Sequence, residues 1–320
     1  MFFQNQFVIL STDKSEFSNM KKFLKFVWGL FAIIGILTTA VLVYSYFADY
    51  YISIYKTLEK QHDDYVQLLR TSGALEKDMV AYEMRINQDS VRAKEIMDYF
   101  CLDTLYDADA DTWTKALAIA QMVAANIPHD NQKIQPEHRN AIDLWKYTKE
   151  VAPAFNCRLH SILTFELLLA AGMDARFVTC LPEDKDDNDC HVVNEVWLPE
   201  QGKWAMIDSD MRHYICDDKG VRLSLREIRE HYITGENMVI CDLLGDRPMK
   251  DPDYATYMAK NTYWFRCHET LSYYQEDPEN RKREAGRHVS LLPAGFKSFI
   301  EDDANVNTSN ADIFWATPSK

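Results

Sequence analysis

The chain has 320 residues, enough for one large globular domain with accessory helices. Glycine and proline are scarce, at 10 residues each, so no segment has the composition of a low-complexity region, and no internal repeat is present. A formal net charge of −14 leaves no basic stripe on the chain, which argues against a nucleic-acid partner.

Residues 26–47 carry no charged side chain, and about 20 such residues span a bilayer. Lys21, Lys22 and Lys25 precede this run, whereas Asp49 follows it, a bias that places the amino terminus inside. We therefore expect a single-pass signal anchor in the cell membrane, with the rest of the chain outside the cytoplasm. A buried core helix and a cleaved signal peptide are the alternatives, although the run exceeds the usual about 7–15 residues and no Ala-x-Ala site follows.

Helical patterns dominate the next hundred residues. From 48 to about 100, apolar residues recur at a spacing of three to four, with charges between them. We expect a helix that docks on the domain; a coiled pair with a second copy is the alternative, although the heptads are short and irregular. Residues 111–127 predict another amphipathic helix, and a polar segment with a short helix near 142–145 leads to Asn156, a plausible N-cap.

The stretch 157–208 carries the residues that suggest chemistry. Cys157 opens an apolar helical pattern that ends at Gly172. Three β-type runs follow, at 176–181, 191–198 and 203–208. His191 begins the second of these runs, and Asp208 ends the third.

A thiol, an imidazole and a carboxylate are the parts of an activated cysteine nucleophile. A helix start and a nearby imidazolium both favour the thiolate, the imidazole exchanges the proton, and the carboxylate fixes the imidazole's tautomer. If the hairpin closes with a two- or four-residue loop, Val193 lies opposite Asp208 and His191 shares its face; a three-residue loop would separate the two. We therefore predict Cys157, His191 and Asp208 as the catalytic residues.

At these residues the sequence resembles the transglutaminase-like superfamily. That family's core pattern is a cysteine at a helix start, an Ala-Gly helix end with an arginine strand, a histidine-led strand ending in Glu-Val-aromatic, and a Trp-x-x-x-Asp strand. Here the pattern occupies, in order, Cys157 and residues 171–176, 191–197 and 204–208. The chain departs from it where the family has glycine, proline and an aromatic residue, at Phe155, Asp174 and Val192-Val193.

The resemblance implies an α+β fold with a papain-like core, in which the helix of Cys157 packs on an antiparallel sheet. It also implies an enzyme that attacks protein or peptide-like amides through a thioester, as a peptidase or amidase with water or as an acyltransferase with an amine. The alternative is an inactive domain that binds peptide or cell-envelope polymer. We expect no cofactor or metal; the Cys157 amide is one oxyanion donor, and Trp145 and Tyr147 are weak candidates for the second.

The acidic loop at 183–189 invites a metal interpretation. Asp184, Asp186 and Asn188 occupy the first positions of a calcium-loop pattern, but Asp189 stands where that loop needs glycine. A solvated acidic loop near the mouth of the site is therefore preferred. His160 and His213 are interpreted as packing or surface residues, because no Cys/His cluster has zinc spacing.

Seven cysteines fit two arrangements. One is a nucleophile plus three disulfides, with Cys180 and Cys190 as the first pair to check, and the other is a nucleophile plus reduced core residues. Beyond Asp208 the patterns predict a hairpin near 217–220, a helix after Ser224, a helix and strand across 252–267, and a last strand near 288–295.

The predicted domain organisation has five parts. They are a cytoplasmic segment at 1–25, the anchor at 26–47, a helical juxtamembrane region at 48–108, a transglutaminase-like domain with a C-terminal extension at 109–300, and a loosely held polar tail at 301–320.

Overall fold

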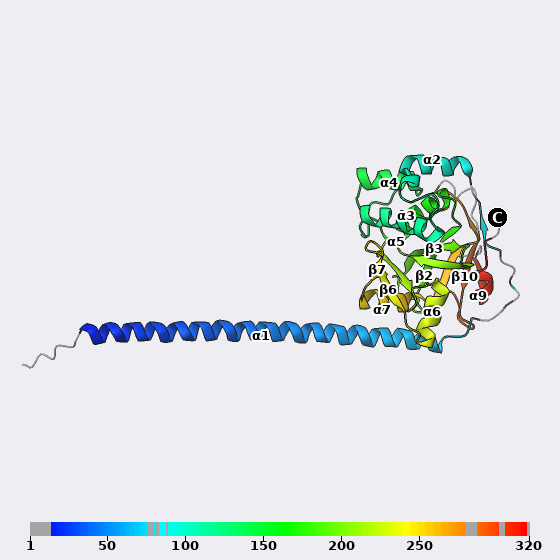
Figure 1. Ribbon diagram of the computed structural model, residues 1–320. Coiled ribbons are helices and arrows are strands. Elements are labelled where there is room, and N and C mark those ends of the chain that lie inside the picture. Colours follow the sequence, from blue (N-terminus) through cyan, green and yellow to red (C-terminus); the bar gives the residue numbers. More distant parts are fainter. Residues whose placement is uncertain are drawn as a thin grey trace, which may run out of the picture. The chain divides into compact units, whose positions relative to one another are not determined.

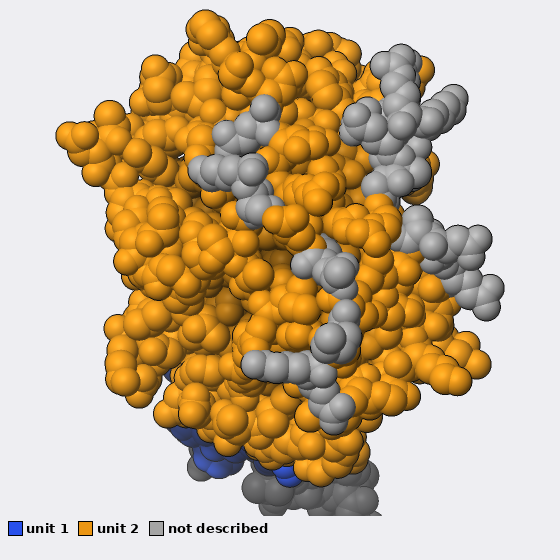
Figure 2. Space-filling model, turned by 90° about the vertical axis from the view of Figure 1, so that its right-hand side faces the viewer, with its two compact units in different colours: residues 1–57 blue, residues 58–320 orange. Residues whose placement is uncertain are grey.

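The computed structural model describes residues 14–75, 78, 80, 83–87, 89–278, 287–300 and 305–318 (Figure 1). These residues fall into two compact units, residues 1–57 and residues 58–320, coloured separately in Figure 2. The first unit, where described, consists of one helix. The second holds all three sheets of the described residues and every predicted site residue.

Helix α1 (Lys14–Thr71) is continuous across the predicted boundary at residue 47. Between Phe17 and Thr71 it contains an 18-residue window with a mean hydropathy of 2.4, none of it buried. Among the described residues, α1 is the one helix that is both long enough and apolar enough to cross a membrane. Signal sequences near an amino terminus share this property. Its last turns belong to the second unit, where Val66 and Leu69 enter the hydrophobic core.

A six-stranded sheet forms the centre of the second unit. Its strands are, in spatial order, β11 (Asn305–Thr308), β10 (His288–Leu291), β8 (Trp264–His268), β2 (Ala175–Leu181), β3 (His191–Leu198) and β4 (Lys203–Ile207). All neighbours pair antiparallel except β10 and β11, which are parallel. β2 and β3 are buried almost throughout, as expected for strands covered on both faces.

Helix α5 (Cys157–Ala170) packs between this sheet and a group of three helices. The covering helices are α2 (Ser90–Phe100), α3 (Thr112–Asn126) and α4 (Ala141–Glu150), which Figure 1 shows together on one side of the unit. Every residue of α5 from Leu159 to Ala170 is buried, because α5 is enclosed by protein on both sides.

The remaining elements lie around this core. They are β5 (His213–Cys216), β6 (Val239–Asp242) and β7 (Arg247–Pro248) in a second sheet, the pair β1 (Arg85–Ile86) and β9 (Thr270–Leu271), α6 (Leu225–Thr234), α7 (Pro252–Asn261), α9 (Ala311–Phe314) and the 3-10 turn η1 (Leu102–Thr104). The capping box predicted at Ser224 and Glu227 is present at the start of α6.

The fold class predicted from the sequence is confirmed, whereas the prediction for the end of the chain is wrong. The α+β core, with the helix of Cys157 on a mainly antiparallel sheet, is present. The polar end, expected to be loosely held, instead contributes β11 and α9 and buries Phe314 completely. The Phe314 carbonyl accepts a hydrogen bond from Arg176 Nη1 at 2.8 Å, which ties this segment to β2.

Candidate active site

Cys157 is the first residue of α5, and its backbone is held by side chains on both sides. Asn156 is the N-cap: its Oδ1 accepts a hydrogen bond from the amide of Leu159 at 3.1 Å. Gln132 Oε1 accepts the amide hydrogen of Asn156 at 3.1 Å. The half-buried thiol of Cys157 therefore stands at the positive end of a well-capped helix.

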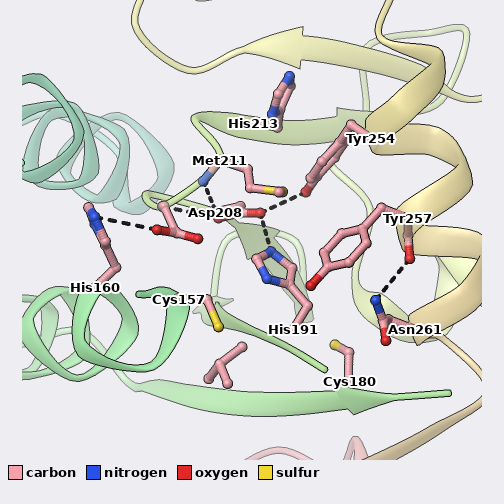
Figure 3. A network of polar contacts seen from close by, with 12 residues as sticks. Cys157, His160, Cys180, His191, Asp208, Met211, His213, Tyr254, Tyr257 and Asn261 are labelled. Atoms are coloured by element: carbon pink, nitrogen blue, oxygen red, sulfur yellow. Dashed lines mark hydrogen bonds and ion pairs between the residues drawn. The ribbon is translucent and has the colours of Figure 1, made fainter. Parts of the chain in front are cut away.

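The hairpin of β3 and β4 places His191 and Asp208 on one face. Leu198 pairs with Lys203 and Asn194 with Ile207, so the loop at 199–202 has four residues, one of the two lengths that the same-face arrangement requires. His191 Nε2 lies 2.6 Å from Asp208 Oδ2, and both side chains are buried (Figure 3).

Asp208 receives further hydrogen bonds that keep it ionised and oriented. The hydroxyl of Tyr254, on α7, donates to Oδ2 at 3.0 Å, and the amides of Asp210 and Met211 donate to Oδ1 at 3.1 and 3.0 Å. Burial by itself raises the pKa of Asp208, but His191 and the Met211 amide outweigh it and lower this pKa. For His191 burial acts in the opposite direction and by itself lowers the pKa. Asp208 and hydrogen bonding with Cys157 outweigh burial and raise the pKa of His191 well above its ordinary value. The protonated imidazole is thus favoured here.

Cys157 lies beside the ring of His191. The sulfur of Cys157, one ring nitrogen of His191 and one carboxylate oxygen of Asp210 all lie within 4.8 Å of one another. Because Nε2 of His191 is bound to Asp208, Nδ1 is the nitrogen that remains for the thiol (Figure 3).

Asp210 is a second carboxylate at the site, distinct in its contacts from Asp208. Both of its oxygens lie 2.9 Å from Nδ1 of His129, which is exposed, and Oδ1 lies 3.4 Å from Nε2 of the buried His160. Burial and the charge of Asp208 raise the pKa of Asp210 to about 6. Burial lowers the pKa of His160 to about 4, so this imidazole is neutral near pH 7.

Tyr257, also on α7, forms one side of the site. Its ring meets that of His191 edge-on with centroids 5.2 Å apart. Its hydroxyl donates to Asp189 Oδ1 at 3.1 Å and to the carbonyl of Cys190 at 3.2 Å. The same carbonyl lies 3.9 Å from the sulfur of Cys157, so the end of the acidic loop borders the thiol.

The acidic loop is bound by a lysine. Lys260 of α7 places its Nζ 2.9 Å from Asp187 and 3.0 Å from Asp189, so this loop, expected to be solvated, is also tied to α7 by an ammonium group. All seven cysteines are free thiols, including Cys180 and Cys190, so the structure has the arrangement with reduced cysteines rather than the one with three disulfides.

The two oxyanion candidates make their contacts elsewhere. Tyr147 donates its hydroxyl to the carbonyl of Ile134, and Trp145 packs edge-on against Phe100 of α2. His160 was predicted to be a packing or surface residue. It is buried and contacts Asp210. His213, interpreted in the same way, stacks on Tyr254 with centroids 4.1 Å apart.

A family model covers Cys157, His191 and Asp208 of this site. Residues 102–209 match the family model described as the transglutaminase-like superfamily. The chain carries a transglutaminase-like domain. No curated protein matches the sequence.

Two solved structures are similar to part of the chain. One is a candidate cysteine protease from Cytophaga hutchinsonii, with 16% identity and a TM-score of 0.30 over 47% of this chain and 49% of that one. The other is a candidate protease from Parabacteroides distasonis, with 13% identity and a TM-score of 0.27 over 50% of this chain and 28% of that one. The chain thus spans about half the length of the first and less than a third of the second.

Two residues of the family's motif form a buried ion pair in the sheet that carries His191. Arg176 and Glu195 are directly opposite each other on β2 and β3, and both are fully buried. Nη2 and Nε of Arg176 lie 2.6 and 3.0 Å from Glu195 Oε2, and the guanidinium lies 4.6 Å from the ring centre of Trp204. This pair joins the strand of His191 to its neighbours and touches no part of the thiol.

Proposed function

We propose that the transglutaminase-like domain is a cysteine enzyme that cleaves or transfers amide-bound acyl groups. Cys157 is the nucleophile, His191 its proton partner and Asp208 the group that orients the imidazole. The observation that carries the proposal is the 2.6 Å contact between His191 Nε2 and Asp208, which leaves Nδ1 for the thiol of Cys157, whose sulfur lies within 4.8 Å of a ring nitrogen.

Each step follows from these positions. The Cys157 thiolate attacks the carbonyl carbon of an amide, and the carbonyl oxygen becomes an oxyanion. The amide hydrogen of Cys157, in the first turn of α5, has no acceptor within the helix and is available to that oxyanion. His191 then gives its proton to the departing nitrogen, the carbon–nitrogen bond breaks, and a thioester remains on Cys157.

The second half-reaction reverses these roles. Water or an amine attacks the thioester, His191 takes a proton from it, and the carbon–sulfur bond breaks to restore the thiolate. Water makes the reaction a hydrolysis, as in a peptidase or amidase, whereas an amine makes it an acyl transfer. Asp208 stabilises the imidazolium in both halves without taking up a proton itself.

The proposal includes a membrane location. Residues 26–47 of α1 are uncharged and exposed to their surroundings in the structure, which suits a segment that contacts lipid. Lys21, Lys22 and Lys25 precede this segment, and the positive-inside rule then directs the domain outside the cytoplasm. The substrate is an amide of a protein or a peptide-like polymer that is accessible there.

A peptide-amide library tests the reaction. The full-length protein, purified in detergent under reducing conditions, is incubated with the library with and without a primary amine, and products are identified by mass spectrometry. We expect cleavage or amine incorporation by the wild type and none by Cys157→Ala. Turnover that persists in Cys157→Ala would overturn the assignment of the nucleophile.

A thioester trapped on the protein separates an enzyme from a binding module. An acyl group found on Cys157 of the wild type after acid quenching would support an enzymatic function. Peptide that binds unchanged, with equal affinity to wild type and to Cys157→Ala, would show a binding domain instead.

A further inference from the structure

The site contains a carboxylate that the proposed reaction does not use. Asp210 lies outside the Cys157–His191–Asp208 sequence of contacts, yet its side chain is only 1% exposed and one oxygen lies within 4.8 Å of the thiol sulfur. A buried carboxylate so close to a nucleophilic thiol is costly unless it has partners, since burial penalises its charge. His129 and His160 are those partners, but the proposed reaction gives no role to a carboxylate oxygen beside the thiol.

Sulfur, nitrogen and oxygen donors here come from three different elements. Cys157 opens α5, His191 opens β3, and Asp210 lies in the turn that follows β4. Thiolate, imidazole and carboxylate are the three side-chain ligands that zinc accepts, and the donors of a three-ligand site leave a fourth position for water.

The spacing of these donors fits a small cation. The point equidistant from three atoms that are 4.8 Å apart lies about 2.8 Å from each, whereas zinc bonds are about 2.0–2.3 Å long. Since 4.8 Å is the upper limit of the spacing, each donor would move inward by less than about 1 Å.

Two of the three ligands, His191 and Asp210, already have hydrogen-bonding partners that are not themselves ligands. His191 directs Nε2 to Asp208 at 2.6 Å, the carboxylate–histidine arrangement that fixes the tautomer of a zinc-binding imidazole. Asp210 is held by His129 at 2.9 Å and by His160 at 3.4 Å. Such outer contacts orient ligands before a metal arrives.

We propose that Cys157, His191 and Asp210 form a binding site for a zinc ion, which occupies the thiol and blocks the nucleophile. The protons on the thiol and on Nδ1 of His191 pass to solvent when the metal binds, and the sulfur, Nδ1 of His191 and a carboxylate oxygen of Asp210 become ligands. Zinc and substrate then compete for the same sulfur atom. The site rests on donor geometry, so it stands whether or not the domain turns over an amide.

Metal titration of the full-length protein tests the site. The protein is purified in detergent, reduced, stripped with a chelator and titrated with zinc against a chromophoric chelator. We expect one zinc ion per chain at the site, at least about a tenfold loss of affinity in Asp210→Asn, and no change in Asp186→Asn. The last variant is the matched control, because Asp186 is an exposed carboxylate of the nearby acidic loop.

Cobalt substitution identifies the ligands directly. Co²⁺ bound to a thiolate gives a near-ultraviolet charge-transfer band, which we expect in the wild type and not in Cys157→Ala. Zinc should also raise the melting temperature of the wild type and not that of Asp210→Asn, which shows in the same scan that the variant is folded. The site is excluded if the wild type takes up no zinc at micromolar concentrations. It is also excluded if the band persists without Cys157, or if folded Asp210→Asn binds zinc as tightly as the wild type.

Discussion

His191 joins two chemically different neighbours, since one ring nitrogen is bound to Asp208 and the other faces the thiol. Asp208 in turn holds four hydrogen bonds, from His191, Tyr254 and the amides of Asp210 and Met211. A carboxylate with that many donors does not rotate freely. The imidazole is consequently held in one tautomer and one orientation, which is what proton exchange with a nearby thiol requires.

Reactivity of Cys157 toward a small alkylating reagent should depend on His191. At pH 6 an ordinary thiol is less than about one per cent ionised, so it reacts slowly. We expect iodoacetamide to label Cys157 of chelator-treated protein in preference to the exposed Cys101, as measured by mass spectrometry. His191→Ala should remove most of the preference and Asp208→Asn less of it, because Asp208 acts through the imidazole. Labelling that rises only above pH 8 and ignores His191 would contradict the activated thiol.

Glu166 makes the stability of the domain depend on pH. Its carboxylate accepts the amide hydrogens of Ala141 and Tyr274, at 2.8 and 2.6 Å, but complete burial outweighs these bonds and raises its pKa to about 7. Between about pH 4.5 and 7 the folded protein therefore keeps a proton that the unfolded chain has lost. The contribution of Glu166 to the free energy of unfolding is therefore largest below about pH 4.5. It decreases by about 3 kcal/mol as the pH rises to about 7.

Glu166→Gln tests this dependence, because the amide stays neutral at every pH. Urea unfolding at pH 5 and pH 7.5, followed by tryptophan fluorescence, should show the wild type losing up to about 3 kcal/mol more than the variant over this range. Equal losses in the two proteins would assign the pH dependence to other groups, such as Asp210.

At the scale of elements, the pairing of β2 with β3 depends on a buried ion pair. Removing one partner of such a pair leaves an uncompensated charge and costs about 3–5 kcal/mol. We expect Glu195→Gln to lower the free energy of unfolding by about this amount, because Arg176 remains buried and loses its charged partner. Glu83→Gln breaks an exposed pair with Arg85 and should cost less than about 1 kcal/mol. Similar costs for both variants in urea unfolding would refute the structural role of the buried pair.

The elements that could be predicted are those whose pattern is local. Helix α5 starts at the expected residue because an apolar run follows an N-cap. Strand β3 also starts at the expected residue, and the four-residue loop after it sets its register with β4. Strand β11 and helix α9 could not be predicted in this way. Their sequence is short and polar, and their positions depend on distant contacts, such as that of Phe314 with Arg176.

The same distinction separates the site residues. Cys157, His191 and Asp208 follow a spacing that a sequence displays. Tyr254 reaches Asp208 from 46 residues away, and Tyr257 reaches Cys190 from 67 residues away, on a helix whose pattern is that of an ordinary amphipathic helix. Asp210 is two residues from Asp208, but only the turn after β4 reveals that it faces the thiol rather than solvent.

At the scale of the whole molecule, the two units differ in what surrounds them. The second unit has a hydrophobic core, whereas the described part of the first unit is a helix whose apolar residues are exposed, among them Trp28, Ile36 and Leu42. An exposed apolar stretch of this length is unfavourable in water and favourable in lipid.

Alkaline phosphatase folds only where its disulfides form, so it reports an oxidising compartment. Fused after residue 60 and expressed in a bacterium, it should be active, because the lysines before the span keep the amino terminus inside and send the remainder across. A fusion after residue 25, which lacks the span, is the matched control and should be inactive. Replacement of Lys21, Lys22 and Lys25 by glutamate should lower the activity of the longer fusion, since it removes the charge difference that sets the orientation. An inactive fusion after residue 60, present at normal amounts in the membrane fraction, would place the domain in the cytoplasm.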